Sequence, residues 1–231
     1  MIDSYLQYLN EMAYYVSPSV QNILKKTPKV TKKEFISRMQ PSDIIVSFTA
    51  KKEIKDKKSM KILAKVVASF QGSPYTSSKV VLDNNMVGGY GVVSREALDS
   101  SVVGKISISE YVKERGEMCL IRIPELTKKQ QIKVVSYVKS MMGVSYNSSS
   151  FFKSVWNRLF NRKILPFFKN EKIDPKELEI IKEPLICSSL VSLSYLIAGY
   201  KKDFNKKRLY DVWPKDFLLD NDTEKICRIE M

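Results

Sequence analysis

Apolar positions in the first 40 residues recur at the three- and four-residue spacing of amphipathic helices. Thr31 stands where a helix N-cap is expected, ahead of a short apolar stripe. We therefore expect an N-terminal helical arm over residues 1–40, packed on the remaining chain or reaching away from it. The stripes consist of Tyr5, Leu6, Leu9, Met12 and Ala13, then Val20, Ile23 and Leu24, then Phe35, Ile36 and Met39.

Short apolar runs bounded by turn residues predict four β-strands further along the chain. They cover residues 44–48, 78–82, 86–93 and 118–123. Asp83, Asn84 and Asn85 form a tight turn between the second and third runs. The third run is rich in glycine at Gly88 and Gly89, which indicates a bulge or a close approach of another group to the backbone.

Helical periodicity returns between and after these strands. It predicts helices over residues 60–70 and 128–142, the latter capped by Thr127, ended by Gly143 and turning Ile132, Val135 and Val138 inward. Between residues 100 and 112 we expect a turn at Gly104 and a short helix from Ser107 or Ser109. The order of helices and strands indicates an α+β fold rather than alternating βαβ units.

Residues 147–186 resemble an insertion that mixes aromatic and basic side chains. Such a segment can bind a membrane surface, a nucleic-acid strand or a protein. It can equally be a helical hairpin whose aromatic side chains fill the core while its basic ones face water. The candidate partner-binding residues are Trp156, Arg158, Phe160, Arg162 and Lys163.

Charge and composition limit the kinds of partner and of catalytic chemistry that the chain can have. The 231 residues include 39 basic and 25 acidic ones, a net charge of +14, which favours a partner that is an anionic surface or a protein. The same charge also keeps a surface soluble. There is no histidine, so the commonest general base and metal ligand are excluded. We expect no metal and no cofactor.

Cysteine usage and hydropathy bear on location. Cys119, Cys187 and Cys227 have no paired spacing, which indicates reduced thiols rather than disulfides or a zinc site. The chain shows no apolar run of membrane-spanning length, and its first residues do not resemble a signal peptide. We therefore expect a cytoplasmic or virion-associated protein without a transmembrane segment.

Cys187 follows Pro184 and opens a run with helical spacing that Gly199 can cap. At a helix N-terminus, unpaired N–H groups and the helix dipole favour a thiolate, as a nucleophilic cysteine requires. The alternative is a buried free cysteine at the start of a core helix.

Four segments together resemble a known family, with a weaker fifth at residues 213–218. They are residues 42–46 (SDIIV), 72–82 (GSPYTSSKVVL), 143–147 (GVSYN) and 187–199 from CSSLV to AG. Over residues 41–220 the chain resembles the circularly permuted branch of the NlpC-type papain-like superfamily. That branch includes bacterial lipoprotein-associated hydrolases, some viral proteins and relatives of lecithin–retinol acyltransferase.

The resemblance implies a permuted papain-like α+β domain with a small antiparallel sheet packed on helices. It implies a cysteine that attacks an amide or ester carbonyl, a histidine base on a strand, and a third polar residue on the next strand. Ser77 occupies the histidine position, or Ser78 if the register slips by one. The third position falls near Gly88 or Gly89, which carry no side chain.

Three functions are compatible with these features. The chain is a degenerate, non-catalytic relative that serves as a binding or structural component, for which the family suggests a viral or phage setting. Or it is an active amidase, esterase or acyltransferase in which Lys79, Asp83 or Tyr75 replaces the base for Cys187. Or it binds nucleic acid or a membrane surface. The predicted organisation is an arm (1–40), the papain-like domain (41–220) and a C-terminal tail (221–231).

Overall fold

Six strands form one antiparallel sheet in the described part of the computed structural model. That part comprises residues 16–47, 73, 75–90, 102–114, 117–144, 187–200, 202, 204–206 and 212–229. The strand order across the sheet is β4-β3-β2-β1-β5-β6. The strands are β1 (Ile44–Ser47), β2 (Ser77–Val81), β3 (Met86–Tyr90), β4 (Val103–Ser107), β5 (Met118–Arg122) and β6 (Glu224–Ile229).

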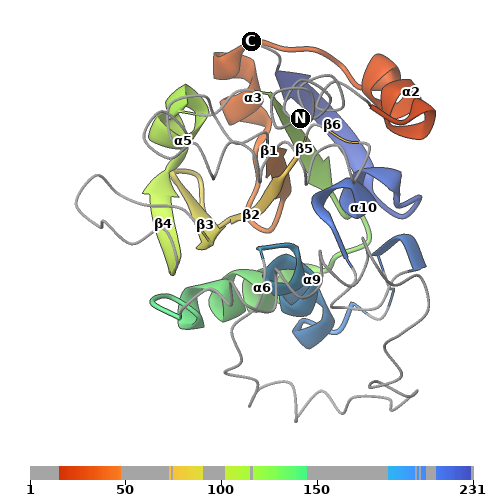
Figure 1. Cartoon of the computed structure of the whole chain (residues 1–231). Coiled ribbons are helices and arrows are strands. Elements are labelled where there is room, and N and C mark those ends of the chain that lie inside the picture. The colour runs from red at the N-terminus through yellow and green to blue at the C-terminus, as the bar shows by residue number, and fades with distance from the viewer. Residues whose placement is uncertain are drawn as a thin grey trace, which may run out of the picture.

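Helices cover both faces of this sheet (Figure 1). On one face lie α3 (Lys32–Arg38) and α5 (Ile108–Glu114), and on the other lie α6 (Lys128–Ser140) and α9 (Cys187–Ile197). Beside them are α2 (Pro18–Lys26), α10 (Pro214–Leu219) and the short 3₁₀ helix η1 (Phe204–Lys206). The expected mixed α+β class with an antiparallel sheet is confirmed.

Strand alternation divides the sheet residues between the two faces. We call the side packed by α6 and α9 the α9 face, and the side packed by α3 and α5 the α5 face. The register pairs Val46 with Ser78 on the α9 face and Ser47 with Ser77 on the α5 face. Central β1 is buried along its whole length, which explains its continuous apolar run.

Two expectations about the elements are wrong. Gly104 is not a turn but lies inside β4, where it pairs with Gly89 of β3; a glycine in a strand gives little sequence signal because it has no side chain to pack. Ile132 does not point inward but is 58% exposed. The buried positions of α6 are Val134 and Val138, and Ile132 lies about 200° around the helix from Val134.

The predicted helix ends are confirmed at several positions. The hydroxyl of Thr31 accepts a hydrogen bond from the N–H of Glu34. Thr127 and Gln130 form a reciprocal capping box at the start of α6. Gly199, at a φ of 88°, ends α9, and the N–H of the next residue, Tyr200, reaches back to the carbonyl of Tyr195.

Segments from both predicted termini are part of this fold. Residues 224–229 of the predicted tail form β6, which pairs with β5 at the sheet edge. Lys29, between α2 and α3, makes a parallel bridge with Arg228 of β6. The described part of the N-terminal segment therefore packs on the core. The predicted helix over residues 60–70 lies outside the described residues.

A turn at Ser42 and Asp43 joins four elements, and we call it the Ser42–Asp43 junction. The N–H of Ser42 donates to the carbonyl of Val81 in β2, and the phenol of Tyr195 in α9 donates to the carbonyl of Ser42. The Asp43 carboxylate accepts two hydrogen bonds from the guanidinium of Arg122 in β5, at 2.8 and 2.7 Å. The same guanidinium donates to the carbonyl of Arg38 at the end of α3.

Replacing Arg122 by alanine is expected to destabilise the fold strongly. The Asp43 side chain is only 2% exposed, and its carboxylate would lose its counter-ion. Removing one partner of a buried pair costs about 3–5 kcal/mol, and we expect about 3 kcal/mol because Arg122 is 23% exposed. Urea unfolding measures this. The control is Lys202→Ala, which removes exposed pairs to Glu125 and Asp222 and should change stability far less, because solvent screens exposed pairs.

The loss of folding stability in Arg122→Ala should also depend on pH. Burial raises the pKa of the Asp43 carboxyl above 3.8, and Arg122 opposes that rise. Without Arg122 the folded state favours the protonated form of the Asp43 carboxyl still more strongly. The contribution of Asp43 to the free energy of unfolding therefore falls as pH rises above 3.8, the ordinary pKa of this carboxyl. The variant should therefore differ less from the wild type at pH 4.5 than at pH 7. Equal differences at both pH values contradict this assignment.

Candidate functional site

Cys187 is the first residue of α9 in the structure, as the sequence predicts. It is half-buried, whereas the next eight residues of the helix are all buried. α9 packs against both the sheet and α6, and even its four serines, Ser188, Ser189, Ser192 and Ser194, are buried. Leu196 and Ile197 at the other end are also half-buried, so Cys187 lies at one of two partly exposed ends of a helix whose middle is enclosed.

The cysteine packs at the edge of an apolar cluster. The buried members are Val103 of β4, Met141 after α6, and Leu190 and Leu193 of α9. Tyr137, Met142 and Val144 lie partly buried against the same cluster. These described neighbours offer the sulfur mainly hydrocarbon contact. None of the buried four can accept a proton from a thiol.

Two adjacent serines of β2 lie on opposite faces of the sheet. Ser78 lies on the α9 face beside Val46, fully buried, and its hydroxyl has no hydrogen-bond partner among the described residues. Ser77 lies on the α5 face beside Ser47, whose hydroxyl bonds to the phenol of Tyr111 in α5. The sequence resemblance aligned Ser77 with the histidine position; the residue that faces α9 is Ser78.

Gly88 and Gly89 accommodate the side chains of Leu82, which follows β2, and of Lys79 in β2. A Cβ on Gly88 would stand 2.8 Å from a methyl carbon of Leu82, and one on Gly89 would stand 2.8 Å from Cδ of Lys79. Gly89 also has a φ of 149°. The predicted close approach to these glycines is therefore present. It leaves no room for a polar side chain at either position without displacing a neighbour.

The alternative bases proposed from sequence are placed differently from one another. Lys79 is buried on the α5 face, opposite to α9, and its ammonium donates to the hydroxyl of Ser77 at 2.6 Å. Asp83 lies in the β2–β3 turn, where its carboxylate accepts from the N–H of Asn85. Tyr75 packs in the core with Val191 of α9, and burial raises the pKa of its phenol well above 10. The structure does not gather these three around one thiol.

The other two cysteines are interior residues. Cys119 of β5 is fully buried on the α9 face, and desolvation raises the pKa of its thiol to about 12. Cys227 of β6 lies in the core of the α5 face, and desolvation raises its pKa to about 11. Both thiols therefore stay protonated at neutral pH and act as small apolar side chains.

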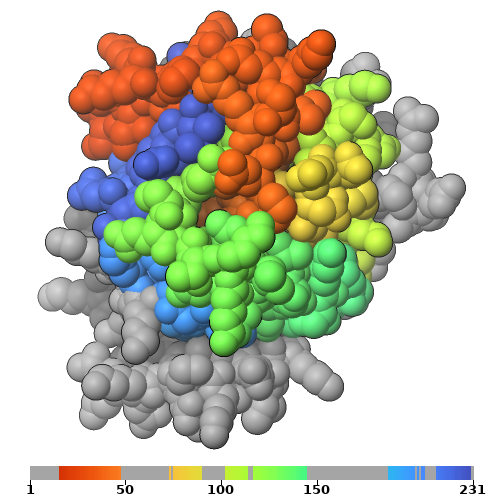
Figure 2. All heavy atoms as spheres, turned by 180° about the vertical axis from the view of Figure 1, so that it is seen from behind, coloured from red at the N-terminus to blue at the C-terminus, as the bar shows by residue number. Residues whose placement is uncertain are grey.

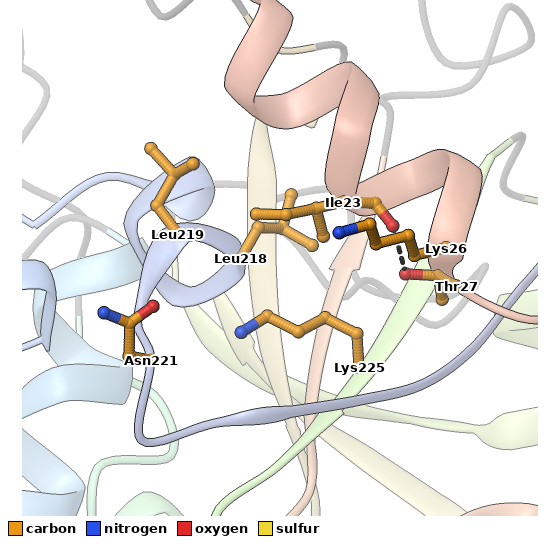
Figure 3. A pocket seen from close by; sticks show the side chains of 7 residues that line it. All are labelled: Ile23, Lys26, Thr27, Leu218, Leu219, Asn221 and Lys225. Carbon is orange, nitrogen blue, oxygen red and sulfur yellow. Dashed lines mark hydrogen bonds between the residues drawn. The ribbon is translucent and has the colours of Figure 1, made fainter.

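A cavity of about 300 Å³ lies away from Cys187, where α2 and α10 meet β6 (Figure 3). Its apolar lining comes from Ile23, Leu218 and Leu219, and the ammonium groups of Lys26 and Lys225 extend along it towards α10. Lys225 donates to the backbone carbonyls of Asp220 and Thr223 and so binds the C-terminal end of α10. Burial lowers the pKa of that lysine. This wall of the cavity is therefore structural.

The remaining predicted site residues cannot be placed. Trp156, Arg158, Phe160, Arg162 and Lys163 lie outside the described residues. Across the described ranges, no helix has the length and apolarity to cross a membrane. The same residues contain no group of three or more cysteine and carboxylate side chains that could hold a metal ion.

No family model matches the chain, and no curated protein matches it.

Thiol labelling should separate the three cysteines. Iodoacetamide reacts with the thiolate, and a thiol with a pKa of about 12 is about 0.01% ionised at pH 8. We expect alkylation of half-buried Cys187 in the folded protein, and of Cys119 and Cys227 only after unfolding in guanidinium. Peptide mass spectrometry over time measures this. Labelling of Cys119 as fast as Cys187 in the folded protein would contradict the burial described above.

Proposed function

We propose that the chain is a degenerate permuted papain-like domain that acts by binding rather than by catalysis, as an interaction or structural component. The single observation that carries this is the combination of a retained Cys187 at the start of α9 with Ser78 on the strand position that faces that helix. A serine hydroxyl does not accept a proton near neutral pH. General acid–base assistance contributes about 10²–10⁴-fold in rate, and this pair does not supply it.

Two further features support the proposal. The whole chain lacks histidine, so no segment of it can bring an imidazole to the thiol. Gly88 and Gly89 fall where the family carries the polar residue that orients the base. The space beside them is filled by the side chains of Leu82 and Lys79, so no orienting group stands there. An active thiol hydrolase or acyltransferase would have to use a base of another kind. The described surroundings of Cys187 favour the non-catalytic alternative.

The first test is a search for an acyl-enzyme. With p-nitrophenyl acetate and a peptide p-nitroanilide, we expect no burst of nitrophenol or nitroaniline, and no rate difference between the wild type and Cys187→Ala. Intact-mass spectrometry of the quenched reaction should show no acyl adduct on Cys187. A stoichiometric burst with a matching adduct, both absent from Cys187→Ala, would overturn the proposal.

The second test restores the missing base. Ser78→His should place an imidazole on the α9 face, whereas Ser77→His should place one on the α5 face. If the arrangement is papain-like, only the first variant should speed the alkylation of Cys187, by about tenfold or more, with a pH profile that follows an imidazole.

Circular dichroism and thermal melting identify variants that fold, because Ser78 is fully buried and histidine is larger. Should folded Ser78→His and Ser77→His react at the same rate, Ser78 is not the base position and the papain-like assignment of this site fails. Should Ser78→His not fold, the adduct experiment above decides the question of catalysis.

A further inference from the structure

Four lysines occupy the outer side of α6. Lys128, Lys129, Lys133 and Lys139 are all exposed, and the helix contains no aspartate or glutamate. None of these four lysines forms an ion pair with another described residue. Figure 2 shows α6, in green and blue-green, open on the surface of the molecule. Four positive charges that no described residue neutralises therefore share one helix.

Helix geometry arranges these lysines in two rows. At about 100° per residue, Lys128 and Lys139 lie within about 20° of each other around the axis, while Lys129 and Lys133 lie about 100–140° away from Lys128. Ile132 and Ser136 occupy the strip between the rows, at about 40° and 80°. The row of Lys128 and Lys139 spans about 16 Å along the helix, which corresponds to about five base-pair steps of a duplex, and the row of Lys129 and Lys133 spans about 6 Å.

We propose that this exposed side of α6, which we call the α6 lysine face, binds the phosphate backbone of double-stranded nucleic acid. A helix with its side chains is about 10–12 Å wide, close to the width of about 12 Å of a major groove. Two lysine rows on either side of a narrow strip can then reach phosphates on both walls of the groove. Lysine ammonium groups bind phosphates as point charges and read no sequence, so the binding is non-specific.

The surface fits the other anionic partners less well. A helix that lies on a membrane buries a broad apolar strip in the lipid, but Ile132 is the one large apolar side chain exposed among the described residues. Protein interfaces are poor in lysine and rich in aromatic side chains and arginine, which the exposed side of α6 lacks. Phosphodiester groups need only the charge and spacing that this face offers.

This inference goes beyond the proposed function, because it names a partner and a surface on a different element from Cys187. It also differs from the insertion at residues 147–186, where the sequence pattern suggested partner binding. The Cys187→Ala variant should bind nucleic acid like the wild type. If Cys187 proves to be catalytic, the proposed non-catalytic function fails, and nucleic-acid binding by the α6 lysine face is still tested by its own experiment.

The test uses two charge-matched variants of the full chain. One replaces Lys128, Lys129, Lys133 and Lys139 by glutamine. The other replaces Lys25, Lys26, Lys32 and Lys33, four exposed lysines of α2 and α3 at the opposite end of the view in Figure 1. Both lower the net charge from +14 by four, and glutamine has a helix propensity close to that of lysine. Thermal melting confirms that both fold.

Fluorescence anisotropy with a labelled 24-base-pair duplex of mixed sequence then gives the affinity between 50 and 200 mM NaCl. Each phosphate contact contributes about 0.9 to the slope of log K against log salt, so the α6 variant should lose about 3–4 from the wild-type slope. At 50 mM salt its affinity should fall at least tenfold. The α2–α3 variant should lose less than about 1 from the slope.

Three outcomes overturn the proposal. In the first, the wild type does not bind the duplex at 50 mM salt. In the second, both variants weaken binding equally, which means that only overall charge matters. In the third, the α6 variant keeps its duplex affinity but loses binding to vesicles containing phosphatidylserine, which means that the face binds lipid. A slope loss confined to the α6 variant, with unchanged vesicle binding, supports it.

Discussion

The fold depends on the buried charge at the Ser42–Asp43 junction. The Asp43 carboxylate stands where β1 begins, and Arg122 is its described counter-ion, so β5 cannot shift along β1 without exposing or stranding a charge. Because the same guanidinium also bonds to the end of α3, and the turn accepts the phenol of Tyr195, one turn fixes elements on both faces of the sheet. Apolar alternation alone would not fix this register, because a slip of two residues preserves the alternation.

That junction also determines where Cys187 lies. Tyr195 fixes the second half of α9 to the turn before β1, and the hydroxyl of Ser188 at its start donates to the carbonyl of Val212. The hydroxyl of Ser194 donates to the carbonyl of Val191 within the helix itself. The bonds of Tyr195 and Ser188 tie both halves of α9 to other parts of the fold, and the cysteine at its first position packs against a cluster that contains Val103 of β4 and Met141 at the end of α6. The sheet register then decides that Ser78, and not Ser77, lies on the face of the sheet that α9 covers.

Much of this fold can be predicted from interactions between residues that are close together in the sequence. Thr127 with Gln130, and Gly199, mark helix ends by hydrogen bonds within a few residues of each other, and the apolar run of β1 reflects burial on both faces. What failed depends on distant contacts. Gly104 is a strand residue only because β3 pairs with it, and Ser77 and Ser78 are equivalent until the pairing with β1 assigns each to a face. The outward position of Ile132 is likewise set by which side of α6 meets the sheet.

The two kinds of function considered for this chain place unequal demands on geometry. Nucleophilic catalysis needs a base within hydrogen-bond reach of the thiol, and loss of one imidazole removes most of the rate. Binding to phosphates by counter-ion release needs only accessible positive charges with no internal partner. A serine such as Ser78 does not meet the first demand, whereas four lysines of α6 that have no ion pair among the described residues meet the second. A chain without histidine can therefore still present a rigid charged surface, because α6, which bears the lysines, is held by Val134 and Val138 in the same core that encloses α9.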